Sequence, residues 1–137
     1  MTSNTEPSGE AIASSEYSEG LAYKAFNEIN EESWDCWHSN SENEPWIGYK
    51  FKDKICVSKF KFVLRNGTKF CYAPTKLAID GSNDRQNWNE IEEYTYSGLG
   101  ANSVIEQVVN NNNMYQYYRI RYKDYNGYGA CGILQFY

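Results

Sequence analysis

Aromatic rings and rigid polar side chains occur together in the segments of this sequence that lack a clear helix or strand pattern. The polar stretch 27–45 contains Trp34, Cys36 and Trp37, and Trp37 precedes His38, the only histidine of the chain. Tyrosine and tryptophan in polar loops supply flat apolar area with a polar tip, which suits a ligand-binding surface. Loops of this composition therefore indicate a binding site.

A second aromatic loop is expected near the C-terminus, at residues 123–129. Glycines flank Tyr128 on both sides, which predicts an exposed ring, although a tyrosine at this place could equally cap the fold. Trp34 competes for the same stacking role unless it plugs its own loop. The candidate ring platforms are Tyr72, Tyr125, Tyr128 and Trp34, with Asn126 as a neighbouring polar group.

The sequence does not indicate a catalytic site. Nucleophilic triads need a histidine with an oriented partner, and this chain has one histidine, no Gly-x-Ser-x-Gly and no His-Glu-x-x-His pattern. Aspartates and glutamates are plentiful, but most lie in polar runs without the apolar neighbours that would tune them for acid–base chemistry. We therefore expect a binding protein and not an enzyme.

The composition favours β-structure and argues against a nucleic-acid partner. Aromatic residues make up 17% of the chain, and 13 of them are tyrosines, which suit a pleated, half-buried surface. The net charge of −5 and the scattered lysines and arginines leave no basic face for phosphates. No stretch approaches the ~20 apolar residues of a membrane span.

Four cysteines, at 36, 56, 71 and 131, stand without a Cys-x-x-Cys pair. Zinc sites need clustered cysteine and histidine ligands, so a structural zinc is not expected. We expect free, buried thiols, because cysteine packs as a small apolar residue. The alternative is a Cys36–Cys71 bridge, since both residues lie in expected loops.

Short strands must carry the aromatic loops. Alternating apolar residues predict about six to eight strands separated by turn signals, with one helical turn at 21–26 and an irregular lead-in at 1–20. Lys52-Asp53-Lys54 is expected to be a turn, and Trp46 and Trp88 are expected in the core. This pattern is typical of a β-sandwich or barrel. The clearest expected strands are 46–51, 55–64, 77–79, 104–109, 115–122 and 131–137.

The order of several short motifs carries a family resemblance along nearly the whole chain. These are Ala22–Asn27, Trp37-His38-Ser39, Pro45–Phe51, Ala73-Pro74, Gly81–Asp84 with Asn87-Trp88, Tyr117–Ile120 and Leu134–Tyr137. In this order and spacing the sequence resembles the discoidin domain, also called coagulation factor five/eight type C, and the related family 32 carbohydrate-binding modules. The resemblance implies one all-β domain over residues 1–137, a jelly-roll β-sandwich of the galactose-binding-domain-like class, with binding loops at one end.

The resemblance also implies roles for particular residues. A histidine at the position of His38 contacts the sugar in similar modules, although His38 could instead only order its loop. Arg65 matches a ligand-binding arginine, whose forked N–H groups suit adjacent hydroxyls. Asn66 follows it directly and not several positions later, which puts its ligand-binding role in doubt and leaves a tight turn as the alternative.

A calcium ion is implied by many similar modules but disfavoured here. The matching positions are Asn27 and Ile133, so both of the expected carboxylates are missing. Asp35 and the nearby Glu28, Glu31 and Glu32 are possible substitutes, and a solvated acidic loop is the simpler interpretation. No cofactor is otherwise expected.

The expected function is that of a lectin-like module for a galactose-type sugar, with a glycan or glycoprotein as partner. The alternative is a protein- or phospholipid-binding discoidin domain that acts in adhesion, although acidic loops disfavour membrane lipid. Residues 1–20 show no export signal. The location is therefore extracellular or at the cell surface if the module belongs to a longer exported chain, and otherwise cytoplasmic.

Overall fold

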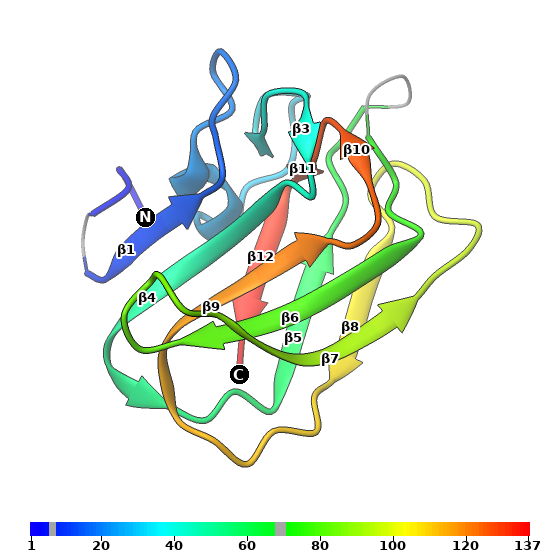
Figure 1. Cartoon of the computed structure of the whole chain (residues 1–137). Helices are drawn as coiled ribbons and strands as arrows, with labels where there is room; N and C mark the ends of the chain where they lie inside the picture. The colour runs from blue at the N-terminus through cyan, green and yellow to red at the C-terminus, as the bar shows by residue number, and fades with distance from the viewer. Residues whose placement is uncertain (6–7, 68–70) are drawn as a thin grey trace.

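Two antiparallel sheets face each other in a β-sandwich (Figure 1). The computed structural model describes residues 1–5, 8–67 and 71–137. The larger sheet has the order β1-β4-β9-β6-β7, and the smaller has the order β12-β5-β8. The larger sheet consists of β1 (Glu10–Ala13), β4 (Trp46–Ile55), β6 (Lys76–Ser82), β7 (Asn89–Thr95) and β9 (Tyr115–Tyr122), and the smaller of β5 (Lys59–Val63), β8 (Val104–Val108) and β12 (Ile133–Phe136).

The core lies between these sheets and follows from the period of two along each strand. Tyr118, Ile120 and Tyr122 of β9 are fully buried, whereas the residues between them lie on the outer face. On the opposite sheet Phe60 and Phe62 of β5 are equally buried. The expected strand at 115–122 and the all-β jelly-roll sandwich are thus confirmed.

Short elements tie the loops together at one end of the sandwich. A two-stranded sheet pairs β2 (Trp37–His38) with β11 (Ala130–Cys131), and another pairs β3 (Glu42–Asn43) with β10 (Asn126–Gly127). Figure 1 shows β3, β10 and β11 together at the top end of the sandwich. The loops at 27–45 and 123–132 are therefore held against each other by main-chain hydrogen bonds.

The helical content is small. Ala22–Phe26 forms a 3-10 helix, η1, where a helical turn was expected. Within the described residues, no helix has the length and apolar character that crossing a lipid bilayer requires.

Three sequence expectations about the elements are wrong. Glu10–Ala13, expected in an irregular lead-in, forms β1 and pairs with β4. Residues 52–54, expected to be a turn, continue β4. The register with β9 shifts between Lys50 and Ile55, so these polar residues lie at an irregularity of the strand. The strand expected from residue 55 begins at Lys59.

The expected core position of Trp46 and Trp88 is also wrong, because both rings are only half-buried. They enclose the Arg119 guanidinium, whose Cζ lies 5.0 Å from the Trp46 ring centre and 4.2 Å from that of Trp88. Arg119 Nε donates to the buried carboxylate of Asp80 at 2.7 Å. The two tryptophans therefore shield a charged group on the outer face of the larger sheet.

All four cysteines are free, so the alternative Cys36–Cys71 bridge does not form. Cys36 and Cys131 are buried as expected, while Cys56 is exposed and Cys71 partly exposed. Burial raises the pKa of the Cys36 thiol to about 11, which keeps it protonated and unreactive.

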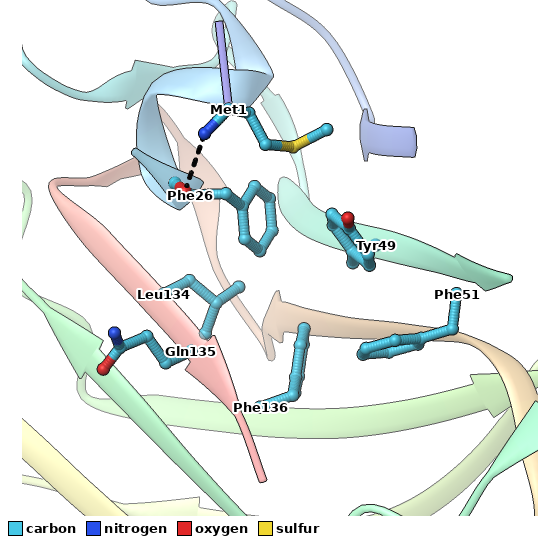
Figure 2. Close-up of a pocket in the computed structure, with 7 residues that line it drawn as sticks. All are labelled: Met1, Phe26, Tyr49, Phe51, Leu134, Gln135 and Phe136. Atoms are coloured by element: carbon cyan, nitrogen blue, oxygen red, sulfur yellow. Dashed lines mark hydrogen bonds between the residues drawn. The ribbon is translucent and has the colours of Figure 1, made fainter. Parts of the chain in front are cut away.

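A hollow of about 280 Å³ opens on the side of the sandwich, between β4 and β12. Figure 2 shows the Phe26, Tyr49, Phe51 and Phe136 rings around it, with the Met1 amino group donating to Phe26 O at 3.3 Å. None of the aromatic loop residues singled out from the sequence lines this hollow.

Candidate functional site

A pocket of about 350 Å³ lies at the loop end of the sandwich. Residues that are distant in the sequence meet here because β2, β11, β3 and β10 tie their loops together. Five of the eight residues expected to bind ligand line it. The lining residues are Tyr17, Trp34, His38, Arg65, Tyr72 and Tyr128.

His38 lies at the centre of the pocket and only 4% of its surface is exposed. Its ring centre is 5.2 Å from that of Tyr17, 5.7 Å from Trp34, 5.3 Å from Tyr72 and 5.4 Å from Tyr128. Four aromatic rings thus surround one imidazole, and any ligand that reaches it must lie against an aromatic surface.

One hydrogen bond to the main chain determines which ring nitrogen of His38 donates and which accepts. Its Nδ1 lies 2.7 Å from Ser39 O. A carbonyl oxygen only accepts, so Nδ1 carries the proton and Nε2 of the neutral ring is an acceptor. Burial, followed by the charge of Arg65, lowers the pKa of His38 below 6.5 and so keeps the ring neutral. His38 therefore offers a hydrogen-bond acceptor.

Arg65 provides the donor and the positive charge of the pocket. Its Nε donates to Ser33 O at 2.5 Å, and its Cζ lies 4.8 Å from the Trp34 ring centre. The Nε–H group and one face of the guanidinium are thereby fixed to the loop that carries Trp34. Arg65 is 5% exposed as a residue, and these contacts hold its guanidinium in a defined direction.

Tyr17 is the lining residue that the sequence did not reveal, because residues 1–20 read as an irregular lead-in. Its N–H donates to His38 O at 2.7 Å, and the His38 N–H donates to Gly20 O at 3.1 Å. The hairpin 17–20 therefore lies on β2, with 45% of Tyr17 exposed. The available signal was an aromatic residue directly before a glycine-containing tight turn.

The main chain positions Tyr72 and Tyr128. Tyr72 has φ +47°, which is uncommon for a bulky residue. The hydroxyl of the buried Tyr122 lies 2.9 Å from Tyr72 O and 3.1 Å from Ala130 O, and its one proton can go to either. Tyr125 OH donates to Tyr128 O at 2.9 Å. Two tyrosine hydroxyls thus fasten the main chain beneath the pocket rings.

The other three candidates lie outside the pocket lining. Asn66 uses its side chain on neighbouring loops, because Nδ2 donates to Glu31 O at 2.6 Å. Tyr125 packs against Tyr122, with ring centres 5.2 Å apart. Asn126 is exposed and pairs with Asn43 between β10 and β3.

Asn27 and Asp35, the weak calcium candidates, accept hydrogen bonds from nearby main-chain N–H groups. Asn27 Oδ1 accepts from the Ile29 N–H at 3.0 Å, and Asp35 Oδ2 accepts from the N–H groups of Glu31 and Glu32 at 3.1 and 2.7 Å. No three histidine, cysteine, aspartate or glutamate side chains gather as metal ligands in the part of the chain that the structure describes. Asn27 and Asp35 instead stabilise turns.

The fold and the loop-end pocket define a discoidin-type module. The chain belongs to the F5/8 type C domain family, whose model matches residues 10–136. No curated protein matches the sequence.

Several solved structures share the fold. The module CpGH89CBM32-5 from Clostridium perfringens, in complex with GalNAc-β-1,3-galactose, is 20% identical over 94% of each chain, with a TM-score of 0.78. SpX-3, a fucose-binding module from Streptococcus pneumoniae, is 13% identical over 98% of this chain and 97% of its own, with a TM-score of 0.73. A fucolectin from striped bass (Morone saxatilis) serum is 19% identical over 100% of this chain and 47% of its own, with a TM-score of 0.77.

Proposed function

We propose that this chain is a non-catalytic saccharide-binding module that holds one terminal galactose-type unit in the pocket around His38. The observation that carries the proposal is the meeting of an acceptor, a donor and aromatic rings in one concavity of about 350 Å³. Such pockets with few convergent polar groups are typical of small-ligand sites. The solved relatives that share the fold include modules named for, or solved with, saccharides.

The polar groups suit two neighbouring hydroxyls. One hydroxyl donates to His38 Nε2, and the next accepts from the guanidinium of Arg65. Galactose carries its 3- and 4-hydroxyls on adjacent carbons in a cis arrangement, and its opposite face presents a continuous set of C–H groups. Under the proposal that apolar face lies against Tyr17, Tyr72 or Tyr128.

The lining residues also support binding without catalysis. Glycoside hydrolysis uses two carboxylic acids beside the scissile bond. The described residues around this pocket supply an imidazole, a guanidinium, an indole and three phenols, and no carboxylate. The same set favours a saccharide over an anionic membrane, because a single arginine gives little attraction to lipid headgroups.

Titration calorimetry with galactose, GalNAc-β-1,3-galactose, fucose and glucose tests the proposal. We expect ~mM to µM dissociation constants for the galactose-type ligands, since solvent competes for each hydrogen bond. Glucose, with its equatorial 4-hydroxyl, should bind at least about tenfold more weakly, because one hydrogen bond is lost.

Two variants identify the site. His38→Ala and Arg65→Ala should each weaken binding by more than about tenfold, the effect of losing one hydrogen bond to a positioned or charged group. Arg85→Ala is the matched control, because Arg85 is exposed and pairs with Glu10 away from the pocket. The proposal fails if neither galactose nor GalNAc-β-1,3-galactose binds, or if both pocket variants bind like the wild type.

A further inference from the structure

We propose that three asparagines, Asn30, Asn66 and Asn102, position Arg65 and Trp34 for ligand. We call them the amide cluster. The inference rests on the proposed saccharide site and adds residues that do not line it. It assigns Asn66, which the sequence indicated as a ligand-binding residue, a positioning role.

The amide cluster is a closed ring of hydrogen bonds between three loops. Asn30 Nδ2 donates to Asn102 Oδ1 at 3.0 Å, Asn102 Nδ2 donates to Asn66 Oδ1 at 3.0 Å, and Asn66 Nδ2 donates to Asn30 O at 3.3 Å. Within the ring, Asn66 and Asn102 each donate and accept through the side-chain amide, whereas Asn30 donates through Nδ2 and accepts at its main-chain oxygen. The three residues come from the loops after η1, after β5 and after β7.

Further hydrogen bonds anchor the ring to the smaller sheet and to the acidic loop. Asn30 Nδ2 also donates to Leu64 O at 3.1 Å, directly after β5. The Asn66 N–H donates to Asn30 Oδ1 at 3.1 Å, and its Nδ2 donates to Glu31 O at 2.6 Å. The main chain at 30–31 is thus fixed to the end of the strand that leads into Arg65.

This anchoring matters because the same loop reaches the pocket at Ser33 and Trp34. Ser33 O accepts from Arg65 Nε, and Trp34 provides the ring beneath the guanidinium. If the loop at 30–34 were not held, Ser33 O and the Trp34 ring would move with it relative to Arg65. Fixing them in the unliganded protein removes an ordering cost that saccharide binding would otherwise carry.

The main chain on the far side of the cluster is shaped to accept Asn30. A Cβ placed on Gly132 would lie 2.4 Å from Asn30 Oδ1 and 2.5 Å from Asn30 Cγ. Glycine at 132 therefore allows the close approach of the amide to the strand end before β12.

Asn102→Gly is the main test, because Asn102 lies outside the pocket lining and has φ +61°, a conformation that glycine adopts without strain. The variant removes two hydrogen bonds of the ring and keeps the backbone. Asn102→Asp is the second variant, of equal shape, which keeps the acceptor for Asn30 but loses the donor to Asn66. Asn112→Gly is the matched control, on an exposed loop at the opposite end of the sandwich.

Two readouts are needed, one of them independent of ligand. Without saccharide, hydrogen exchange at Arg65 Nε–H and at the amides of residues 31–35 should become at least about tenfold faster in Asn102→Gly and unchanged in Asn112→Gly. With GalNAc-β-1,3-galactose as probe, the dissociation constant should rise about tenfold, as expected for ordering one or two side chains on binding.

Unchanged exchange at Arg65 Nε–H in both Asn102 variants would overturn the inference, and so would faster exchange with unaltered affinity for a probe that the wild type binds. If the wild type does not bind the probe, the proposed function fails for that saccharide, while the exchange data still decide whether the amide cluster positions Arg65. Should Asn102→Gly not fold, Asn102→Asp carries the same comparison.

Discussion

His38 shows how one side chain acquires a defined hydrogen-bonding sense from its surroundings. Its Nδ1 is committed to Ser39 O, so Nε2 is the atom that remains for a hydroxyl. The groups around the ring are the aromatic side chains of Tyr17, Trp34, Tyr72 and Tyr128, and the charge of Arg65. Burial of the ring and the charge of Arg65 favour neutral histidine and outweigh the hydrogen bond to Ser39 O, which favours the charged form.

Binding should therefore depend on pH through His38. Its pKa lies below 6.5 because of burial and Arg65, so the affinity should be constant above about pH 7 and fall as the pH drops through the folded-state pKa. Protonation converts Nε2 from acceptor to donor and places a second charge near Arg65. The conformational stability follows the same sign, because the unfolded chain takes up the proton first.

Titrations with a galactose-type ligand at half-unit steps between pH 5 and 8 measure this dependence, with circular dichroism to confirm the fold. His38→Gln, which cannot titrate, should bind weakly and with a flat profile over the same range. A wild-type affinity that rises as the pH falls below 6.5 would contradict the assignment of Nε2 as the acceptor.

Residue types alone were enough to find most of the residues that line the pocket. They did not reveal the asparagines that hold its loops together. Trp34, His38, Arg65, Tyr72 and Tyr128 stand out because aromatic and basic residues are unusual in polar loops. Asn66 also stands out beside Arg65, yet its amide is used between loops, and only the three-dimensional position of Asn30 and Asn102 shows this. Long-range pairing of polar groups leaves no local pattern in a sequence.

At the scale of elements, the hairpin 17–20 closes one side of the pocket. A Cβ added to Gly20 would lie 2.4 Å from His38 Cβ and 2.7 Å from His38 N. Gly20→Ala should therefore displace Tyr17 from His38 and weaken saccharide binding about tenfold, the equivalent of one lost ring contact. Calorimetry measures the loss of affinity. Gly98→Ala is the comparison, because no atom lies within 4 Å of the added Cβ. Its φ of +70° means that this variant reports local backbone strain without a clash. Equal affinity in the Gly20 variant and the wild type would show that Tyr17 takes no part.

The end of β9 supports the same pocket from below, through the Tyr122 hydroxyl. Tyr122→Phe leaves the carbonyls of Tyr72 and Ala130 without this donor in a fully buried place, which should lower the free energy of unfolding by about 1–3 kcal/mol. Urea unfolding followed by fluorescence measures it. Tyr137→Phe, whose hydroxyl is on an exposed residue, should change stability little. A Tyr122→Phe variant as stable as the wild type would show that this hydroxyl does not contribute to the free energy of unfolding.

Strands with a strict alternation were predictable, and interrupted ones were not. The strand at 115–122 has the bounds expected from its alternating pattern. By contrast, residues 52–54 are polar at every position, yet pairing with β9 on both sides of an irregularity keeps them in β4. β1 was missed because its four residues gain their order from β4 and not from their own propensity.

At the scale of the whole molecule, the charge distribution separates the saccharide proposal from the lipid alternative. The chain has 18 acidic and 13 basic residues and a net charge of −5. Several of its ion pairs lie at the outer face of the larger sheet, where the half-buried Arg121 and Lys123 contact Glu90. The lining of the pocket contains one charged side chain, Arg65.

Affinity for an uncharged saccharide should therefore be insensitive to salt, changing less than about twofold between 0.05 and 0.5 M sodium chloride, because no ion pair forms on binding. The protein should not sediment with phosphatidylserine-containing vesicles at either ionic strength, since the negative surface repels a chain of net charge −5. Parallel calorimetry and vesicle sedimentation on the same preparation measure both. If the protein sediments with the vesicles, if high salt reverses this, and if no saccharide binds, a lipid-binding discoidin domain is favoured. Only binding that depends on charge responds to ionic strength in that way.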